Sequence, residues 1–361
     1  MKALIQNDYG DPAKVLELRD VPAATAGEGE VVIDIEAAVV HMADARTVLG
    51  MDGFRKKLPR TPGYEGVGRI SSVGPGVEGL APGLRVFAPI GSGTYREQIT
   101  AAADDLLPAP EGDPVQVALL SLSPATALQM LQDFVTLEPG DFLLQNAGNS
   151  AVGRMVIQLC NEMKLKLINV VKSTPVISEL KEIGAGVVLL DTNDLPDRII
   201  AVTQGAPVKL ALDAVGGEAT ARLAECLAEE ATLVNYGSMS GEPCHMPADL
   251  LGSRGIRLRG INPTRQLARH PPEERKAMFE RIGSLVAARR LQARLGATYP
   301  LAEFASAFQH ALREGDKRFG KIVMRVQEIE APPAAEPAED AIPDAAQADE
   351  VPAEASEPAV A

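Results

Sequence analysis

The chain has 361 residues, 46% of them apolar, so it is long and apolar enough to build two ordinary domains. Its formal charge of −14 is uneven: residues 328–361 carry ten Asp or Glu and no Lys or Arg, whereas residues 1–327 carry 35 basic and 39 acidic side chains. A nearly neutral body without a long apolar run gives no sign of a nucleic-acid surface or a membrane span, and three widely spaced cysteines argue against a disulfide framework or a structural zinc cluster.

The first 120 residues are predicted to be rich in β-strands. Short apolar runs alternate with turns rich in Gly and Pro, which favours a small barrel or a rolled sheet. The predicted strands are 1–6, 30–40, 66–74 and 85–90.

From about Pro124 the pattern changes to strands that alternate with helices. Such alternation is typical of βαβ units and predicts a parallel, doubly wound sheet, hence an α/β fold. The predicted strands are 141–146, 166–171, 187–190, 208–215 and 231–237. The predicted helices between them are 150–163, 176–183, 195–203 and 218–229.

The C-terminal part returns to a mixed pattern and ends in an acidic tail. We predict a long helix over 273–291, a second helix over 301–314 and a closing strand over 320–326. Residues 328–361 are rich in Ala, Pro and Glu and hold only isolated aliphatic side chains, so we expect a disordered tail.

Small residues mark the junction between the strand at 141–146 and the helix that follows it. Gly148-x-Ser150-x-x-Gly153 has the spacing of a dinucleotide-binding turn, in which glycines permit a tight turn and a close approach of strand and helix. The pyrophosphate of such a cofactor lies on free N–H groups at the helix N-terminus. The alternative is a tight turn without a ligand.

The end of the next strand indicates which dinucleotide is bound. An NAD site usually has a carboxylate there, whereas this chain has Lys172-Ser173-Thr174. A cation beside hydroxyls suits a 2′-phosphate and favours NADPH; a solvated Lys172 is the alternative. Further strand ends place Asp213, Tyr236 and Gly237 on the ribose and nicotinamide side, although Asp213 could equally orient a loop.

Several segments resemble the zinc-free branch of the medium-chain dehydrogenase/reductase superfamily, above all its mitochondrial-type 2-enoyl thioester reductases and then its quinone oxidoreductases. They are GYEGVGRISSVGPGVEGLAPGLRV, SPATALQML, LLQNAGNSAVGRMVIQL, LALDAVGG, VNYGSMSG and GKIVM. The resemblance covers about residues 1–326. It implies a GroES-like domain at 1–120 that 290–327 complete, a Rossmann domain at 121–289, an active cleft between them, NADPH as cofactor and a homodimer.

The resemblance also carries over individual residues. It places Thr126 near the nicotinamide, and Lys321 either reaches the cofactor or holds the closing strand. Together with the turn and the strand ends, the candidate cofactor residues are Thr126, Asn146, Gly148, Asn149, Ser150, Val152, Gly153, Lys172, Ser173, Asp213, Tyr236, Gly237 and Lys321.

Zinc chemistry is not expected. Zinc-dependent members carry Gly-His-Glu where this chain has Gly63-Tyr64-Glu65, and no Cys precedes Cys160. The Cys-His-Cys site of those members cannot be assembled from these positions, which disfavours alcohol oxidation through a zinc alkoxide.

Two departures concern the catalytic residues. Enoyl reductases have an Asn-Pro-x-Asp stretch that here reads His41-Met42-Ala43-Asp44, and their Gly-x-Tyr-Gly stretch reads Gly50-Met51-Asp52-Gly53. The candidate catalytic residues are therefore His41, Asp44 and Asp52. Either His41 has become the proton donor, with Asp52 in support, or His41 only hydrogen-bonds the substrate or ribose.

The sequence thus predicts an NADPH-dependent oxidoreductase that reduces an α,β-unsaturated thioester or enone. A quinone reductase and a non-catalytic NADPH-binding protein are the alternatives, and the missing Tyr keeps both open. A small-molecule substrate is expected, and neither a nucleic acid nor a membrane is expected as a partner. We expect dimerisation through a Rossmann edge strand near ATLVNYG or RLRGIN, and, because MKALIQNDYGDP shows no secretory signal, a cytoplasmic location.

Overall fold

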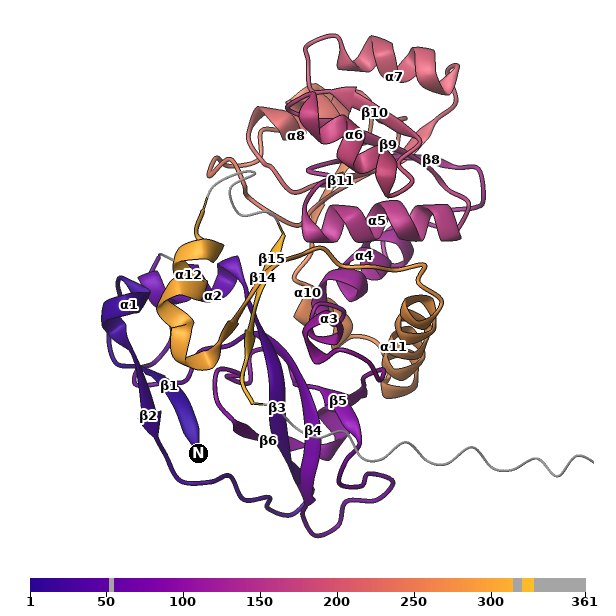
Figure 1. Cartoon of the computed structure of the whole chain (residues 1–361). Helices are drawn as coiled ribbons and strands as arrows, with labels where there is room; N and C mark the ends of the chain where they lie inside the picture. Colours follow the sequence, from indigo (N-terminus) through magenta and orange to yellow (C-terminus); the bar gives the residue numbers. More distant parts are fainter. Residues whose placement is uncertain (52–54, 314–319, 328–361) are drawn as a thin grey trace, which may run out of the picture. The chain divides into compact units, whose positions relative to one another are not determined.

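A computed structural model describes residues 1–51, 55–313 and 320–327. The predicted disordered tail at 328–361 and Asp52 lie outside the described residues. Two large sheets and a short hairpin organise the described part of the chain (Figure 1).

The first large sheet is mostly antiparallel and contains strands from both ends of the chain. Its order is β14-β15-β3-β4-β5-β7, and β6 also pairs with β3. The closing strand β15 pairs with β3 through Ile322 opposite Val40, so the C-terminal segment completes the N-terminal sheet. The strands are β3 (Glu30–Val40), β4 (Glu65–Val73), β5 (Arg85–Phe87), β6 (Gln98–Ala102), β7 (Leu107–Pro108), β14 (Leu295–Pro300) and β15 (Lys321–Arg325); β1 (Lys2–Gln6) and β2 (Leu16–Asp20) form the hairpin.

The second sheet is wholly parallel, and its strand order is the one that dinucleotide-binding folds use. The order β10-β9-β8-β11-β12-β13 corresponds to 3-2-1-4-5-6 along the chain. The strands are β8 (Phe142–Asn146), β9 (Lys166–Val171), β10 (Val187–Leu190), β11 (Val208–Asp213), β12 (Thr232–Asn235) and β13 (Arg257–Gly260). The predicted α/β fold with a doubly wound sheet is therefore confirmed.

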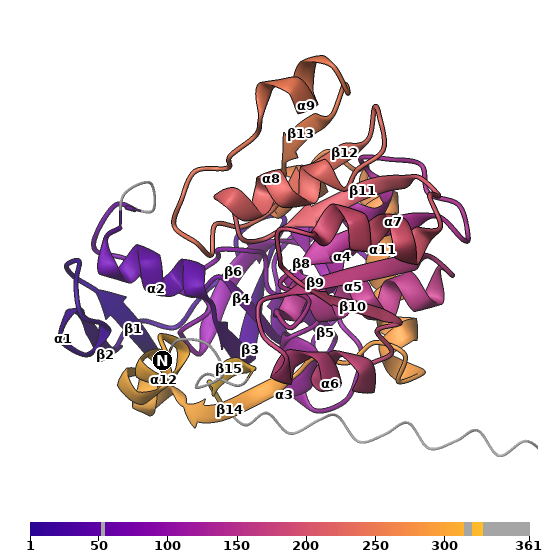
Figure 2. The ribbon, with the colours of Figure 1, turned by 90° about the horizontal axis from the view of Figure 1, so that it is seen from above.

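Helices cover both faces of the parallel sheet because its side chains alternate between two cores. Leu143 belongs to the core under α4, α5 and α6, whereas Leu144 belongs to the core under α7 and α8. Figure 2 shows these helices around the strands, with β12 and β13 toward the top of the view and β9 and β10 below. These helices are α4 (Leu122–Gln132), α5 (Ala151–Glu162), α6 (Pro175–Glu182), α7 (Leu195–Thr203) and α8 (Glu218–Glu225).

The other helices are mostly short. They are α1 (Pro12–Val15), α2 (Met42–Leu49), α3 (Pro114–Ala118), α9 (Ala248–Gly252), α10 (Pro263–Leu267), α11 (Pro272–Ala287) and α12 (Phe304–Ala311). By length and composition alone, residues 114–132, which include α3 and α4, could cross a membrane, but 83% of their apolar window is buried inside the fold. Buried helices of a protein core have the same length and composition, so packing explains this stretch.

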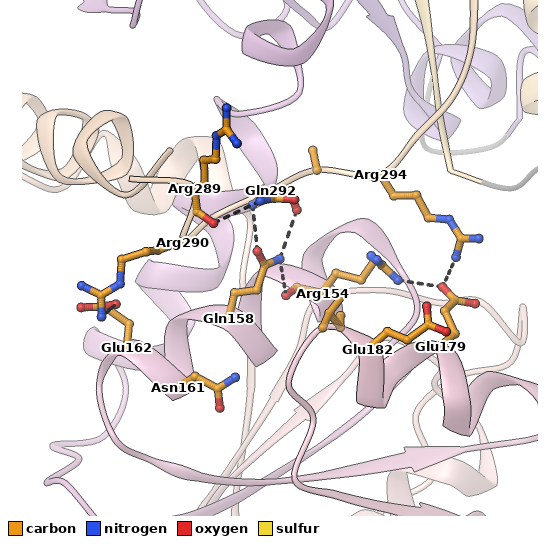
Figure 3. Close-up of a pocket in the computed structure, with 12 residues that line it drawn as sticks. Arg154, Gln158, Asn161, Glu162, Glu179, Glu182, Arg289, Arg290, Gln292 and Arg294 are labelled. Atoms are coloured by element: carbon orange, nitrogen blue, oxygen red, sulfur yellow. Dashed lines mark hydrogen bonds and ion pairs between the residues drawn. The ribbon is translucent and has the colours of Figure 1, made fainter. Parts of the chain in front are cut away.

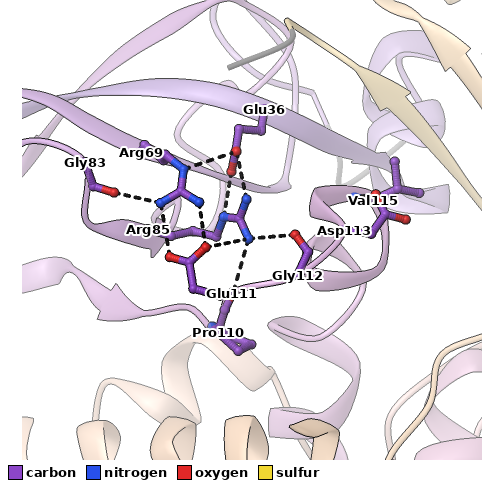
Figure 4. A network of polar contacts seen from close by, with 9 residues as sticks. All are labelled: Glu36, Arg69, Gly83, Arg85, Pro110, Glu111, Gly112, Asp113 and Val115. Carbon is purple, nitrogen blue, oxygen red and sulfur yellow. Dashed lines mark hydrogen bonds and ion pairs between the residues drawn. The ribbon is translucent and has the colours of Figure 1, made fainter. Parts of the chain in front are cut away.

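A buried ionic network fixes three strands of the first sheet to one another (Figure 4). Glu36 on β3 accepts two hydrogen bonds from Arg85 on β5, at 2.8 and 2.9 Å. Arg69 on β4 donates to Glu111 at 2.6 Å, and Arg85 also donates to the carbonyl of Gly112 at 2.8 Å. Removal of one partner would leave an uncompensated charge in the interior, so the network acts as a unit.

Candidate active site

The turn between β8 and α5 has the geometry of an anion-binding helix start. Ser150 is the N-cap of α5, and its hydroxyl accepts a hydrogen bond from the Gly153 N–H at 3.0 Å. A Cβ at Gly153 would lie 2.5 Å from the Ala147 carbonyl oxygen, and one at Gly148 would lie 2.8 Å from Oδ1 of Asn169. The small residues of the motif are thus required by close packing.

The left-handed backbone conformation in this turn belongs to Ala147, with φ of 50°. Gly148 is needed because the side chains of Asn169 and Leu180 approach it, rather than because of its own φ.

Two buried amides that the sequence analysis missed support this turn. Gln145 on β8 donates to the Gly153 carbonyl at 3.0 Å and to Oδ1 of Asn169 at 2.8 Å. Asn169 on β9 donates in turn to the Val187 carbonyl on β10 at 3.1 Å. Polar residues inside otherwise apolar strands were the signal that could have identified them, because buried polar groups need partners.

Asp213 lies at the carboxyl end of β11, and protein groups use both of its oxygens. Its Oδ1 accepts from Asn146 at 2.6 Å and from the N–H groups of Val215 and Gly216, and its Oδ2 accepts from Thr220 at 2.7 Å and from the Asn235 amide. The structure therefore favours the loop-orienting role of Asp213 over direct contact with a ribose. Asn146 shares that structural role, because its amide donates to Asp213 and accepts from the Ala214 N–H.

The remaining candidate cofactor residues lie along the same edge of the sheet. Lys172 and Ser173 follow β9 and are exposed, as is Asn149 in the turn, while Val152 lies half-buried in the first turn of α5.

Tyr236 and Gly237 follow β12. A Cβ at Gly237 would lie 2.7 Å from the Ala214 carbonyl oxygen, so this position needs glycine for packing. The Tyr236 hydroxyl is buried and has no partner of normal hydrogen-bond geometry within the described ranges; burial raises the pKa of Tyr236, and nearby Ser150 opposes that shift. An unused polar atom beside the turn fits a site built for a polar cofactor.

A second polar cluster surrounds His41, which caps α2. Glu65 on β4 contacts Nε2 of His41, and Nζ of Lys321 on β15 lies 3.1 Å from Nδ1. The structure thus brings two candidate residues, His41 and Lys321, into contact. Glu65, which was not a candidate, is only 1% exposed and is central to the cluster.

Glu65 is held as a carboxylate. Burial alone would raise its pKa, but the charge and hydrogen bond of His41, together with Lys321 and Ser121, lower the pKa below its ordinary value. Its Oε1 accepts from the Ser121 hydroxyl at 2.5 Å and from the Leu122 N–H at 2.8 Å, both at the start of α4.

Asp44 is a buried carboxylate beside His41. Its Oδ2 accepts from the His41 N–H at 3.2 Å and from the Tyr95 hydroxyl at 2.9 Å. Burial raises the pKa of Asp44, partly offset by His41 and Tyr95. These contacts place it at the N-terminus of α2, and the catalytic role predicted for it stays a prediction; Asp52 lies outside the described residues.

Contacts with α4 and α10 bring this cluster to the parallel sheet. Tyr64, next to Glu65, lies 3.0 Å from the Thr264 hydroxyl on α10, which begins just after the carboxyl end of β13. The rings of Tyr64 and His41 meet edge to face with centroids 6.0 Å apart. Thr126 lies one turn into α4, buried, and its hydroxyl donates to the Leu122 carbonyl at 2.7 Å.

A charged groove of about 630 Å³ lies between α5, α6 and the segment after α11 (Figure 3). Arg154 donates to Glu179 at 2.7 Å, and Arg294 pairs with the same carboxylate. Gln158 and the backbone of Gln292 exchange two hydrogen bonds, at 2.8 and 3.1 Å. None of its lining residues is a cofactor or catalytic candidate, so we assign the groove a packing role.

Within residues 1–51, 55–313 and 320–327, no group of three or more His, Cys, Asp or Glu side chains could hold a metal ion.

Comparison with known proteins identifies the family. Residues 27–111 match the model of the alcohol dehydrogenase GroES-like domain, and residues 151–282 match that of the zinc-binding dehydrogenases. The mitochondrial enoyl-[acyl-carrier-protein] reductase of Mus musculus is 34% identical over 87% of this chain and 86% of its own length.

Two solved structures are also similar. A mycobacterial quinone oxidoreductase is 27% identical with a TM-score of 0.81, over 90% of this chain and 100% of its own. A mycobacterial structure complexed with NADPH is 26% identical with a TM-score of 0.76, over the same shares of the two chains.

The relatives overturn one expectation. The enoyl-[acyl-carrier-protein] reductases of Mus musculus, Rattus norvegicus and Homo sapiens are all named as mitochondrial, so the expected cytoplasmic location is wrong. The family itself is as the residues indicated. The chain belongs to the medium-chain dehydrogenase/reductase superfamily and is similar to the enoyl thioester reductases within it.

Proposed function

We propose that this protein is an NADPH-dependent reductase of 2-enoyl thioesters or conjugated enones. The observation that carries the proposal is its similarity, over most of both chains, to an enoyl-[acyl-carrier-protein] reductase. A dinucleotide-type turn on the parallel sheet and a polar cluster next to the same sheet edge agree with it.

NADPH is the proposed cofactor, and when bound it supplies the hydride. The N–H groups at the start of α5 would hold its pyrophosphate, with Ser150 as the capping residue. Lys172 and Ser173, which are exposed at the end of β9, would hold the 2′-phosphate. Thr126 and Tyr236 are the proposed neighbours of the nicotinamide half, and the rest of the chain orients the acceptor and keeps water away from it.

Quinone reduction is the second candidate, because the chain has Gly50-Met51-Asp52-Gly53 where the enoyl reductases place a Tyr. Hydride transfer to a quinone needs no carefully placed carbon acid. A protein that binds NADPH without turnover is the third candidate, and the same missing Tyr favours it.

The test is NADPH oxidation against a panel of 2-enoyl-CoA esters of several lengths, benzoquinones and conjugated enones, with NADH measured in parallel. We expect turnover of at least one enoyl-CoA and a preference for NADPH. Turnover of quinones alone would establish the second candidate. Binding of NADPH without oxidation by any acceptor would establish the third.

We also propose a homodimer formed through β13. This strand is the edge of the parallel sheet, and most of its side chains are exposed, whereas β12 pairs on both sides and cannot be an edge. An exposed edge strand offers unpaired backbone groups to a second copy. Light scattering should give twice the mass of one chain, and Leu258→Pro should reduce it to one; a single-chain mass for the unmodified protein would contradict the proposal.

A further inference from the structure

Glu65, His41 and Lys321 form a hydrogen-bonded line although they come from β4, the start of α2 and β15. The Glu65 carboxylate meets Nε2 of His41 through one oxygen and is fixed by Ser121 and Leu122 through the other. Nδ1 of His41 meets Nζ of Lys321. The line therefore has a rigid, buried end at Glu65 and runs through His41 to Nζ of Lys321.

The chemistry of these groups determines where protons lie. A carboxylate can only accept, so Nε2 of His41 carries a hydrogen that it donates to Glu65. Nδ1 and Nζ can then approach to 3.1 Å only if one proton lies between them. Either the Lys321 ammonium donates to a neutral imidazole, or the His41 imidazolium donates to a neutral amine. In both forms the His41–Lys321 pair carries one proton that it can donate.

This pair lies beside the edge of the parallel sheet where a dinucleotide is expected. The Glu65 carboxylate is bonded to the start of α4, and neighbouring Tyr64 reaches Thr264 at the start of α10, directly after β13. Ligands of such sheets bind outside the carboxyl ends of the strands. The pair is thus near the place at which a substrate would receive hydride.

We propose that the His41–Lys321 pair, oriented by Glu65, supplies the proton that a 2-enoyl thioester takes up at its α carbon. The inference depends on the proposed enoyl reductase function. Hydride adds to the β carbon, the electron pair of the C=C bond moves to the α carbon and its carbonyl as an enolate, and the pair donates its proton to the α carbon. The pair then regains a proton from water, and the products are the saturated thioester and NADP⁺.

Within the described ranges, the other charged and titratable groups near His41 are engaged elsewhere. Asp44 lies at the backbone N–H of His41 and is engaged with Tyr95, and Arg60 lies near Asp44. Tyr64 lies at the edge of the imidazole, but its hydroxyl is directed to Thr264.

Kinetics at saturating NADPH test the proposal with His41→Asn and Lys321→Met. Loss of a general acid typically costs about 10²-fold or more in rate, so we expect kcat for enoyl-CoA to fall by at least that factor in both variants. The wild-type rate should fall as pH rises and the pair loses its proton, and His41→Asn should abolish that dependence. Lys321→Arg should restore part of the rate, and Tyr64→Phe should keep most of it.

The outcomes distinguish a failure of the proposed proton donor from a failure of the proposed enoyl reductase function. Enoyl-CoA turnover within threefold of wild type in both His41→Asn and Lys321→Met would overturn the proposal, as would a loss confined to Tyr64→Phe. Failure of the wild-type protein to reduce any enoyl-CoA would overturn the proposed function instead. In that case ¹⁵N NMR of His41 still tests the pair: Lys321→Met must shift the titration of His41, and an unshifted titration would overturn the shared proton.

Discussion

Lys172 is the residue on which the proposed preference for NADPH depends. It follows β9, the second strand of the parallel sheet in chain order, where NAD-binding chains place a carboxylate. Its side chain is exposed, and Ser173 and Thr174 supply hydroxyls next to it. A compact cation among hydroxyls favours a phosphate over a neutral ribose.

Lys172→Ala is expected to weaken NADPH binding by about 10–100-fold, which corresponds to about 1.4–2.7 kcal/mol of binding free energy, and to leave NADH binding unchanged. Fluorescence titration of both cofactors measures this. Lys166→Ala is the matched control, because Lys166 is exposed at the opposite end of the same strand and should lie far from the phosphate. Equal weakening by the two variants would indicate a general effect of charge and would contradict a 2′-phosphate site at Lys172.

At the scale of elements, periodic patterns were predictable and non-local contacts were not. The βα alternation from residue 141 onward predicted all of β8 to β12, because buried parallel strands are continuous apolar runs. Helix α2 was missed, since HMADARTVLG has only a short apolar pattern and its start depends on the His41 and Asp44 cap. Strand β6 was missed because its pairing with β3 joins residues far apart in the chain.

In the candidate site, too, local patterns were predictable and non-local contacts were not. The Gly148–Gly153 turn was readable because its physical requirement is local, a strand followed by a helix with small residues between them. The role of Asp213 could not be predicted, because its partners come from the ends of two other strands, β8 and β12, and from α8. Glu65 was not readable either, because its partners lie on α2 and α4, and β15 completes the line.

At the scale of the whole molecule, buried carboxylates couple stability to pH in opposite directions. Asp213 is desolvated, which alone would raise its pKa, but Thr220, Asn146 and backbone N–H groups lower the pKa below the ordinary value. Its contribution to stability is therefore present above about pH 4 and is lost as pH falls through its folded pKa. Burial raises the pKa of Asp44, so the fold favours its protonated form and ionisation of Asp44 reduces stability as pH rises.

Asp213→Asn and Asp44→Asn should therefore have different effects on the free energy of unfolding. An amide at position 213 turns one oxygen into a donor that faces other donors, so we expect a loss of about 2–4 kcal/mol in the free energy of unfolding at pH 7. The same exchange at position 44 removes a buried charge and should leave stability at pH 7 unchanged or raised. Urea denaturation between pH 7 and pH 3 measures both, and the Asp213→Asn curve should lose part of the wild-type decline in acid. Equal losses at pH 7 in the two variants would contradict the assignment, because they would mean that both positions need an ionised carboxylate to the same degree.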